Sequence, residues 1–153
     1  MTDPDPARVV ADADVLAADL LSGGSAREAL DHVRAHSWVD LVASDPLLDD
    51  VIAALADRPL AAEWRERVER ERVRVEQAAG DHPALASAYE GNAAQVLSFD
   101  EGVTSAGANL SLQSHVRVSL RTPAAFVTLF DPASLYEAVE GGEYPGPDRD
   151  PRG

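Results

Sequence analysis

The sequence predicts an α/β fold: a doubly wound parallel sheet of four to five strands with helices on both faces. Short apolar runs alternate along the chain with segments of helical spacing. Residues that begin helices, such as the pairs Asp45-Pro46, Thr122-Pro123 and Asp131-Pro132, stand at the boundaries between them. Strands separated by helices are typical of parallel sheets that are covered on both faces.

The first half of the chain alternates strand and helix signals. Ser22-Gly23-Gly24 stops the first helix, and Ser25 with Glu28 forms a capping box for the second. Asp45 as N-cap and Pro46 at the first helical position begin the third. The predicted elements are strand Arg8–Ala11, helix Val15–Leu21, helix Ala26–Ala35, strand Val39–Ala43, a helix from Pro46 with apolar Leu47, Leu48, Val51, Ile52 and Leu55, and a helix from Pro59 to Ala79.

The second half continues the alternation after Gly80, which ends the long helix. The predicted elements are helix Pro83–Glu90, strand Gln95–Ser98, strand Val116–Leu120, helix Ala124–Leu129 and a helix from Pro132 to Val139. Residues 8–140 therefore form one domain. We expect residues 1–7 and the tail 141–153, rich in Gly, Pro and Asp, to be disordered.

The composition is strongly acidic, with a formal net charge of −14, and all 13 basic residues are arginine. Such a lysine-free chain resembles proteins of organisms that keep molar salt in the cytoplasm, where acidity is a solubility device. Screening over about 3 Å in molar salt weakens the electrostatic objection to nucleic-acid binding. There is no cysteine for a disulfide or a thiolate. No apolar run spans a membrane and no signal peptide is recognisable, so we expect a cytoplasmic protein without membrane contact.

Carboxylates follow the predicted strands. Asp12 comes directly after the first strand and Asp100 after strand Gln95–Ser98. In open α/β sheets, ligands bind beyond the carboxyl ends of the strands, so these two side chains are expected to meet. Asp81 stands at a helix start, and Asp50 lies on the helix after the second strand. Taken singly, each has a plainer interpretation, because aspartate caps helices or is simply solvated.

Taken together, four segments in order resemble the PIN-domain nucleases, in particular the branch of putative toxins. They are RVVADADVLAADLLSGGSAREAL, LVASDPLLDDVIAAL, DHPALASAYEGNAAQVLSFDEG and VRVSLRTPAAFVTL. The resemblance implies Mg²⁺- or Mn²⁺-dependent hydrolysis of RNA phosphodiesters, with RNA as substrate. If this protein is the toxin of a toxin–antitoxin pair, the resemblance also implies an antitoxin protein as its partner. It is compatible with a homodimer of this chain. The family's four catalytic, metal-binding acids fall on Asp12, Asp50, Asp81 and Asp100, with Asp14 and Ser98 in supporting positions.

The chemistry of the family fits these residue types. Clustered carboxylates repel one another unless a cation neutralises them, and Mg²⁺ and Mn²⁺ prefer oxygen ligands. A metal pair about 3.5–4 Å apart activates a water and stabilises the leaving oxygen. Asp50 is a methylene shorter than the family's usual Glu, and Asp49 competes for its role. Ser98 is expected to orient Asp100.

Alternatives remain open. A PIN-like fold that has lost catalysis and serves as a binding or scaffold module is the main rival, favoured by Glu101 where the family often has a basic residue. Haloacid-dehalogenase phosphatases also open with strand-DxD but end with an acidic pair that is missing here, and receiver domains need a lysine. The segment Glu63–Gln77 alternates charge at i,i+4 spacing, which favours a salt-bridged helix over an RNA-backbone ridge formed by Arg65 and Arg72.

Overall fold

The computed structural model describes residues 5–76, 83–99 and 119–151, and it confirms the predicted fold class. Five parallel strands form one sheet in the order β3-β2-β1-β4-β5. The strands are β1 Asp5–Ala11, β2 Asp40–Ser44, β3 Arg72–Val75, β4 Ala93–Leu97 and β5 Ser119–Arg121. The helices are α1 Ala13–Leu21, α2 Gly24–Arg34, α3 Asp45–Ala54, α4 Arg58–Glu71, α5 Pro83–Glu90, α7 Pro123–Leu129 and α8 Pro132–Val139.

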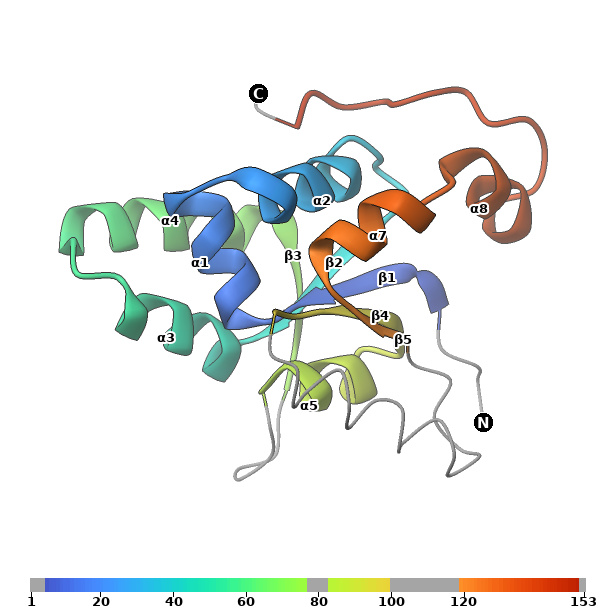
Figure 1. Ribbon diagram of the computed structural model, residues 1–153. Coiled ribbons are helices and arrows are strands. Elements are labelled where there is room, and N and C mark those ends of the chain that lie inside the picture. Colours follow the sequence, from blue (N-terminus) through green and yellow to red (C-terminus); the bar gives the residue numbers. More distant parts are fainter. Residues whose placement is uncertain (1–4, 77–82, 100–118, 152–153) are drawn as a thin grey trace.

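Helices cover both faces of the sheet. In Figure 1, α5 lies on one face and α1, α2 and α7 lie on the other, where α2 packs against both α1 and α7. The core between these layers is built from the fully buried strand residues Val9, Val10, Val42 and Val96, together with helix residues such as Leu16. β1 is the central strand, buried along most of its length, so the residue that follows it emerges in the middle of the sheet edge.

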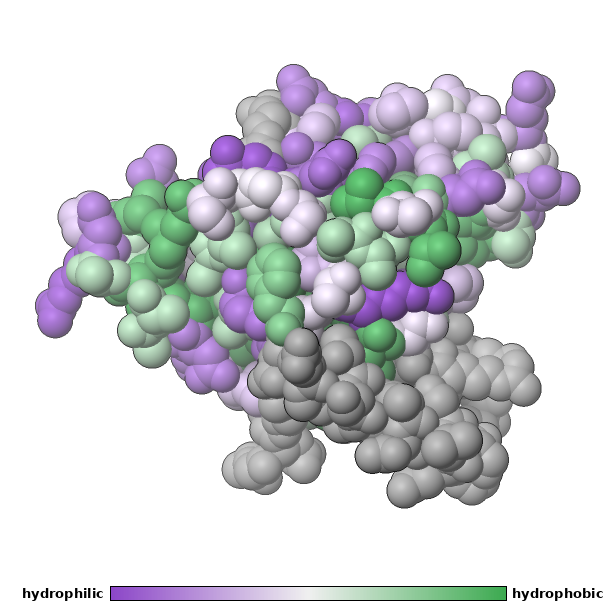
Figure 2. Space-filling model, viewed as in Figure 1, coloured by the Kyte–Doolittle hydropathy of each residue, from purple (hydrophilic) through white to green (hydrophobic). Residues whose placement is uncertain are grey.

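The surface is mixed rather than uniformly charged. The face shown in Figure 2 carries hydrophobic residues over α7, where Leu129 is exposed, and hydrophilic residues along the C-terminal tail. Within the described part of the chain, no helix combines the length and the apolar character needed to cross a membrane.

The long helix predicted from Pro59 to Ala79 is shorter than expected. α4 ends at Glu71, and Arg72–Val75 forms the edge strand β3, which pairs with β2 from Leu41↔Arg72 to Ser44↔Val75. The segment RVRV alternates with period 2 and contains β-branched residues, which suits a strand. That local alternation, with the open edge of β2 to pair with, outweighs the i,i+4 charge pattern that favoured a helix.

Two helices have their N-caps one or two residues before the predicted positions. α2 begins at Gly24 behind Gly23, whose φ of 78° suits glycine, so Ser25 does not cap it and no capping box forms. At α3 the N-cap is Ser44 rather than Asp45: the Ser44 hydroxyl accepts a hydrogen bond from the Leu47 amide at 3.3 Å. Ser44 is the last residue of β2, so the cap is already in extended backbone.

The ends that we expect to be disordered make contacts in the part that the structure describes. β1 already begins at Asp5. In the tail, the Tyr144 hydroxyl lies 2.6 Å from Nε2 of buried His36, and the Ser37 amide donates to the Asp148 carboxylate at 2.7 Å. The guanidinium of Arg149 donates to the His36 carbonyl at 2.9 Å. Composition predicts disorder because glycine and proline are frequent, whereas in the structure these side chains bond the tail to the two residues that follow α2 and its C-cap.

Candidate active site at the carboxyl edge of the sheet

The strand order creates a topological switch point between two central strands. From β1 the chain adds β2 and then β3 on one side, and it returns to place β4 on the other side of β1. The connections that follow β1 and β4 therefore run in opposite directions. The position between these two strands is the topological switch point, where open α/β sheets bind ligands. Ala11 and Leu97 are paired at the ends of these strands, so Asp12 and Ser98 follow side by side.

Asp12 is held at this point by its backbone and by both carboxylate oxygens. It is the N-cap of α1, and its Oδ1 accepts a hydrogen bond from the Ala13 amide at 2.8 Å. Its own amide donates to the Leu97 carbonyl at 2.8 Å. Only 8% of Asp12 is exposed. Asp12 therefore caps a helix, which is one of the two roles expected from the sequence. The cap uses only Oδ1, so the second role, in a functional site, depends on the other oxygen.

The second oxygen of Asp12 faces β4. The Ser98 hydroxyl, fully buried, donates to Asp12 Oδ2 at 2.9 Å, joining residues that are 86 positions apart. Next to this bond, Asp14 Oδ2 on the first turn of α1 accepts a hydrogen bond from the Phe99 amide at 3.0 Å. The structure therefore brings Asp12, Asp14 and Ser98 together, with Ser98 on Asp12. The predicted partner of Ser98, Asp100, lies outside the described residues.

Asp50 occupies a different position. It lies on α3, which packs against α1, and its side chain is exposed. No hydrogen bond or ion pair within the described ranges joins it to Asp12. Its neighbour Asp49 binds Arg65 of α4 at 3.0 Å. Asp49 is thereby committed to the α3–α4 contact, which leaves Asp50 the better candidate of the two.

Asp81 and Asp100, the other two predicted acids, lie outside the described residues, so the meeting of four carboxylates stays a prediction. Over residues 5–76, 83–99 and 119–151, no group of three or more His, Cys, Asp or Glu side chains is arranged to hold a metal ion. Oxygen donors such as Asp12 and Asp14 are nevertheless the ligand type that Mg²⁺ and Mn²⁺ prefer.

The arginines proposed as an RNA-backbone ridge are engaged within the protein. Arg72 begins β3 with only 2% of its side chain exposed and donates to the Ala43 carbonyl at 3.0 Å. Arg72 and Arg74 both hydrogen-bond Asp45, and these contacts, with Arg74 the stronger, hold the pKa of Asp45 well below its usual range. Arg65 binds Asp49 and Glu69. The ridge is therefore a structural network between α3, α4 and β3.

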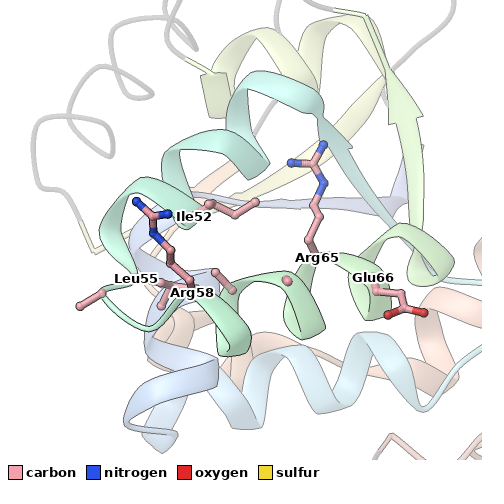
Figure 3. Close-up of a pocket in the computed structure, with 8 residues that line it drawn as sticks. Ile52, Leu55, Arg58, Arg65 and Glu66 are labelled. Carbon is pink, nitrogen blue, oxygen red and sulfur yellow. The ribbon is translucent and has the colours of Figure 1, made fainter.

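A cavity of about 640 Å³ lies elsewhere, between α3 and α4. Figure 3 shows Ile52 and Leu55 on one side, with Arg58, Arg65 and Glu66 contributed by α4. Its walls are mostly apolar, and neither Asp12 nor Ser98 lines it. This cavity lacks the converging carboxylates that the sequence predicts, so the switch point remains the candidate site.

The residue that sequence reasoning passed over is Phe99. It follows buried Ser98, yet 44% of it is exposed. The signal was present in the segment VLSFDEG, where an aromatic residue separates the hydroxyl residue from the fourth acid. Its exposure depends on how the chain leaves β4, which the local pattern does not encode.

A family model described as "Family of unknown function (DUF7384)" matches residues 3–152. No curated protein and no solved structure is significantly similar to the chain.

Proposed function

The chain belongs to DUF7384, a family of unknown function, and we propose that it is a PIN-like ribonuclease that hydrolyses RNA phosphodiesters with Mg²⁺ or Mn²⁺. The observation that carries the proposal is the 2.9 Å hydrogen bond from Ser98 to Asp12 across the switch point. It orients one oxygen of a nearly buried carboxylate at the place where this class of sheet binds ligands. The order of the four motif segments along the sequence supports the same assignment.

In the proposed site each residue has a distinct task. Asp12 presents an oxygen to a cation, and Ser98 fixes the direction of that oxygen, as partners of metal ligands commonly do. Asp14 holds the backbone after β4 through the Phe99 amide. Asp50, Asp81 and Asp100 are the further carboxylates of the proposal. A bound divalent cation would polarise the phosphate and lower the pKa of an attacking water.

The alternative is a PIN-like module that binds without catalysis. The exposed position of Asp50 on α3 favours it. The wider context of the proposal is a cytoplasmic toxin in a cell of high salt content, with an antitoxin as partner and a homodimer as its assembly.

Cleavage of RNA with Mn²⁺ in molar KCl tests the proposal. Asp12→Asn keeps the cap, because asparagine caps helices as well as aspartate, but removes the charge that attracts the cation. The matched control is Asp57→Asn, since Asp57 is also an N-cap, accepting from the Leu60 amide at 2.9 Å. We expect Asp12→Asn to abolish cleavage and Asp57→Asn to leave it unchanged, with both variants folded. Equal cleavage by wild type and Asp12→Asn would refute the site.

A further inference from the structure

We propose that Phe99 is a stacking platform that holds a nucleobase beside the Asp12–Ser98 pair and thereby positions the substrate strand. This role rests on the proposed function, and it adds a positioning residue that the acidic motif does not include. The ring contributes contact area for a base, while the carboxylates beside it deal with the phosphate.

The first argument is the exposure of an aromatic residue at this place. Large apolar side chains that are exposed in the described part of the chain are Leu21, Tyr89, Phe99 and Leu129. Leu21 and Leu129 are the last residues of α1 and α7, and Tyr89 lies near the end of α5, before β4 begins. Only Phe99 follows the carboxyl end of a strand at the switch point. Its two predecessors, Leu97 and Ser98, are fully buried, so the chain turns outward at this residue.

The second argument is that the backbone beneath the ring is fixed. The Ser98 amide donates to the Arg121 carbonyl at 3.0 Å, and the Ser98 hydroxyl donates to Asp12. The Phe99 amide donates to Asp14 at 3.0 Å. Three hydrogen bonds thus tie two consecutive residues to β5 and α1. The backbone that carries the ring is therefore ordered before binding, which lowers the entropy lost when a flat partner is bound.

The third argument is electrostatic. A chain with a net charge of −14 repels a polyanion, and Arg65, Arg72 and Arg74 are bound to carboxylates. Contacts to phosphates weaken steeply as salt rises. Base stacking on an aromatic ring does not depend on charge, and every base has a face that stacks. In molar salt, a nucleic-acid-binding protein of this charge therefore gains most from stacking.

The test measures binding of a short oligoadenylate RNA in molar KCl, with Ca²⁺ in place of Mn²⁺. The comparison strand has the same length and phosphates but abasic residues. We expect wild type to prefer oligoadenylate, and Phe99→Leu to lose roughly 5- to 100-fold in affinity for it. Phe99→Trp is expected to restore binding, and its added indole fluorescence is expected to be quenched by oligoadenylate alone. Tyr89→Leu, which removes an exposed aromatic ring from α5, is the matched control and is expected to bind as wild type does.

Kinetics with Mn²⁺ separate this inference from the proposed function. If wild type cleaves RNA, Phe99→Leu should raise KM while thermal melting stays unchanged. Cleavage and binding by Phe99→Leu equal to those of wild type would overturn the stacking role and leave the nuclease. Base-dependent quenching in Phe99→Trp without any cleavage by wild type would overturn the nuclease and leave the stacking. Absence of oligoadenylate binding by wild type would overturn the stacking role, and absence of RNA cleavage with Mn²⁺ would overturn the nuclease.

Discussion

Replacing Ser98 by alanine tests whether its hydrogen bond serves a metal site or only the fold. The change removes the donor at 2.9 Å from Asp12 while both residues stay buried. A hydrogen bond to a charged group contributes about 1.5–3 kcal/mol to the free energy of unfolding. For a domain of this size, the loss corresponds to a fall in Tm of about 3–12 °C.

The same change is expected to weaken Mn²⁺ binding. Loss of a partner that orients a ligand lowers metal affinity about 10- to 100-fold. At an Mn²⁺ concentration of a hundred times the wild-type Kd, wild type gains about 2.7 kcal/mol of stability. Ser98→Ala should then gain only about 0.4–1.4 kcal/mol. The reason is that an unsupported Asp12 oxygen spends less time in the direction that the cation needs.

Thermal melts with and without Mn²⁺, at constant molar KCl, measure both effects. Ser87→Ala is the control: Ser87 is equally buried, and its hydroxyl accepts from the Ser44 amide at 3.2 Å, away from Asp12. This variant should lose about 1 kcal/mol of stability and keep the full gain from Mn²⁺. If Ser98→Ala is destabilised but gains as much from Mn²⁺ as wild type, the bond to Asp12 is structural and the argument for a metal site fails.

Three further outcomes concern the scaffold. Arg34→Met leaves the buried carboxylate of Asp19 without the guanidinium that contacts it at 2.8 Å, and should lower the free energy of unfolding in urea by about 3–5 kcal/mol. Arg70→Met, in an exposed ion pair, is the control and should change that free energy by no more than about 0.5 kcal/mol. Gly91→Ala places a Cβ against the buried side chain of Val42 in β2 and should lower stability by about 1–3 kcal/mol; an unchanged Tm would contradict the packing. Hydrogen bonds from the Ser37 side chain and amide lower the pKa of Asp148, so tail docking is at full strength above the unfolded pKa, near 3.9, and weakens as pH falls below it. Hydrogen exchange of the tail amides between pH 7 and 3 should show this release, and uniform protection would refute it.

The sequence predicted the fold class because its strand and helix signals alternate, and a parallel sheet is what such alternation builds. The starts of α7 and α8 were placed correctly, since Thr122 and Asp131 are N-caps followed by proline. β3 was missed because its four residues continue a charged helix without a glycine or proline between them. In that segment, it is the pairing with β2 that makes the residues form a strand instead of continuing the helix.

The candidate site was predictable only in part. Asp12 and Ser98 were both placed near strand ends, and parallel strands share one carboxyl edge. Ser98 was expected to orient Asp100, however, and its hydroxyl bonds Asp12 in the structure, while the meeting of Asp12 with Asp100 stays a prediction. Where Asp50 lies relative to Asp12 depends on how α3 is rotated against α1, and no local pattern encodes that rotation. The direction of the Phe99 ring likewise depends on the turn of the chain after β4.

The central place of β1 has a consequence for the order in which the molecule is made. On the ribosome β1 is made before β2 and β4, so one edge of β1 can pair before the other, and Ser98 follows Asp12 by 86 positions. Pairings of such long separation form late in folding. Until β4 has been made, Asp12 lacks the hydrogen bond from Ser98 and the strand that pairs beside it. Under the proposed ribonuclease function, the site therefore stays incomplete until β4 has paired with β1.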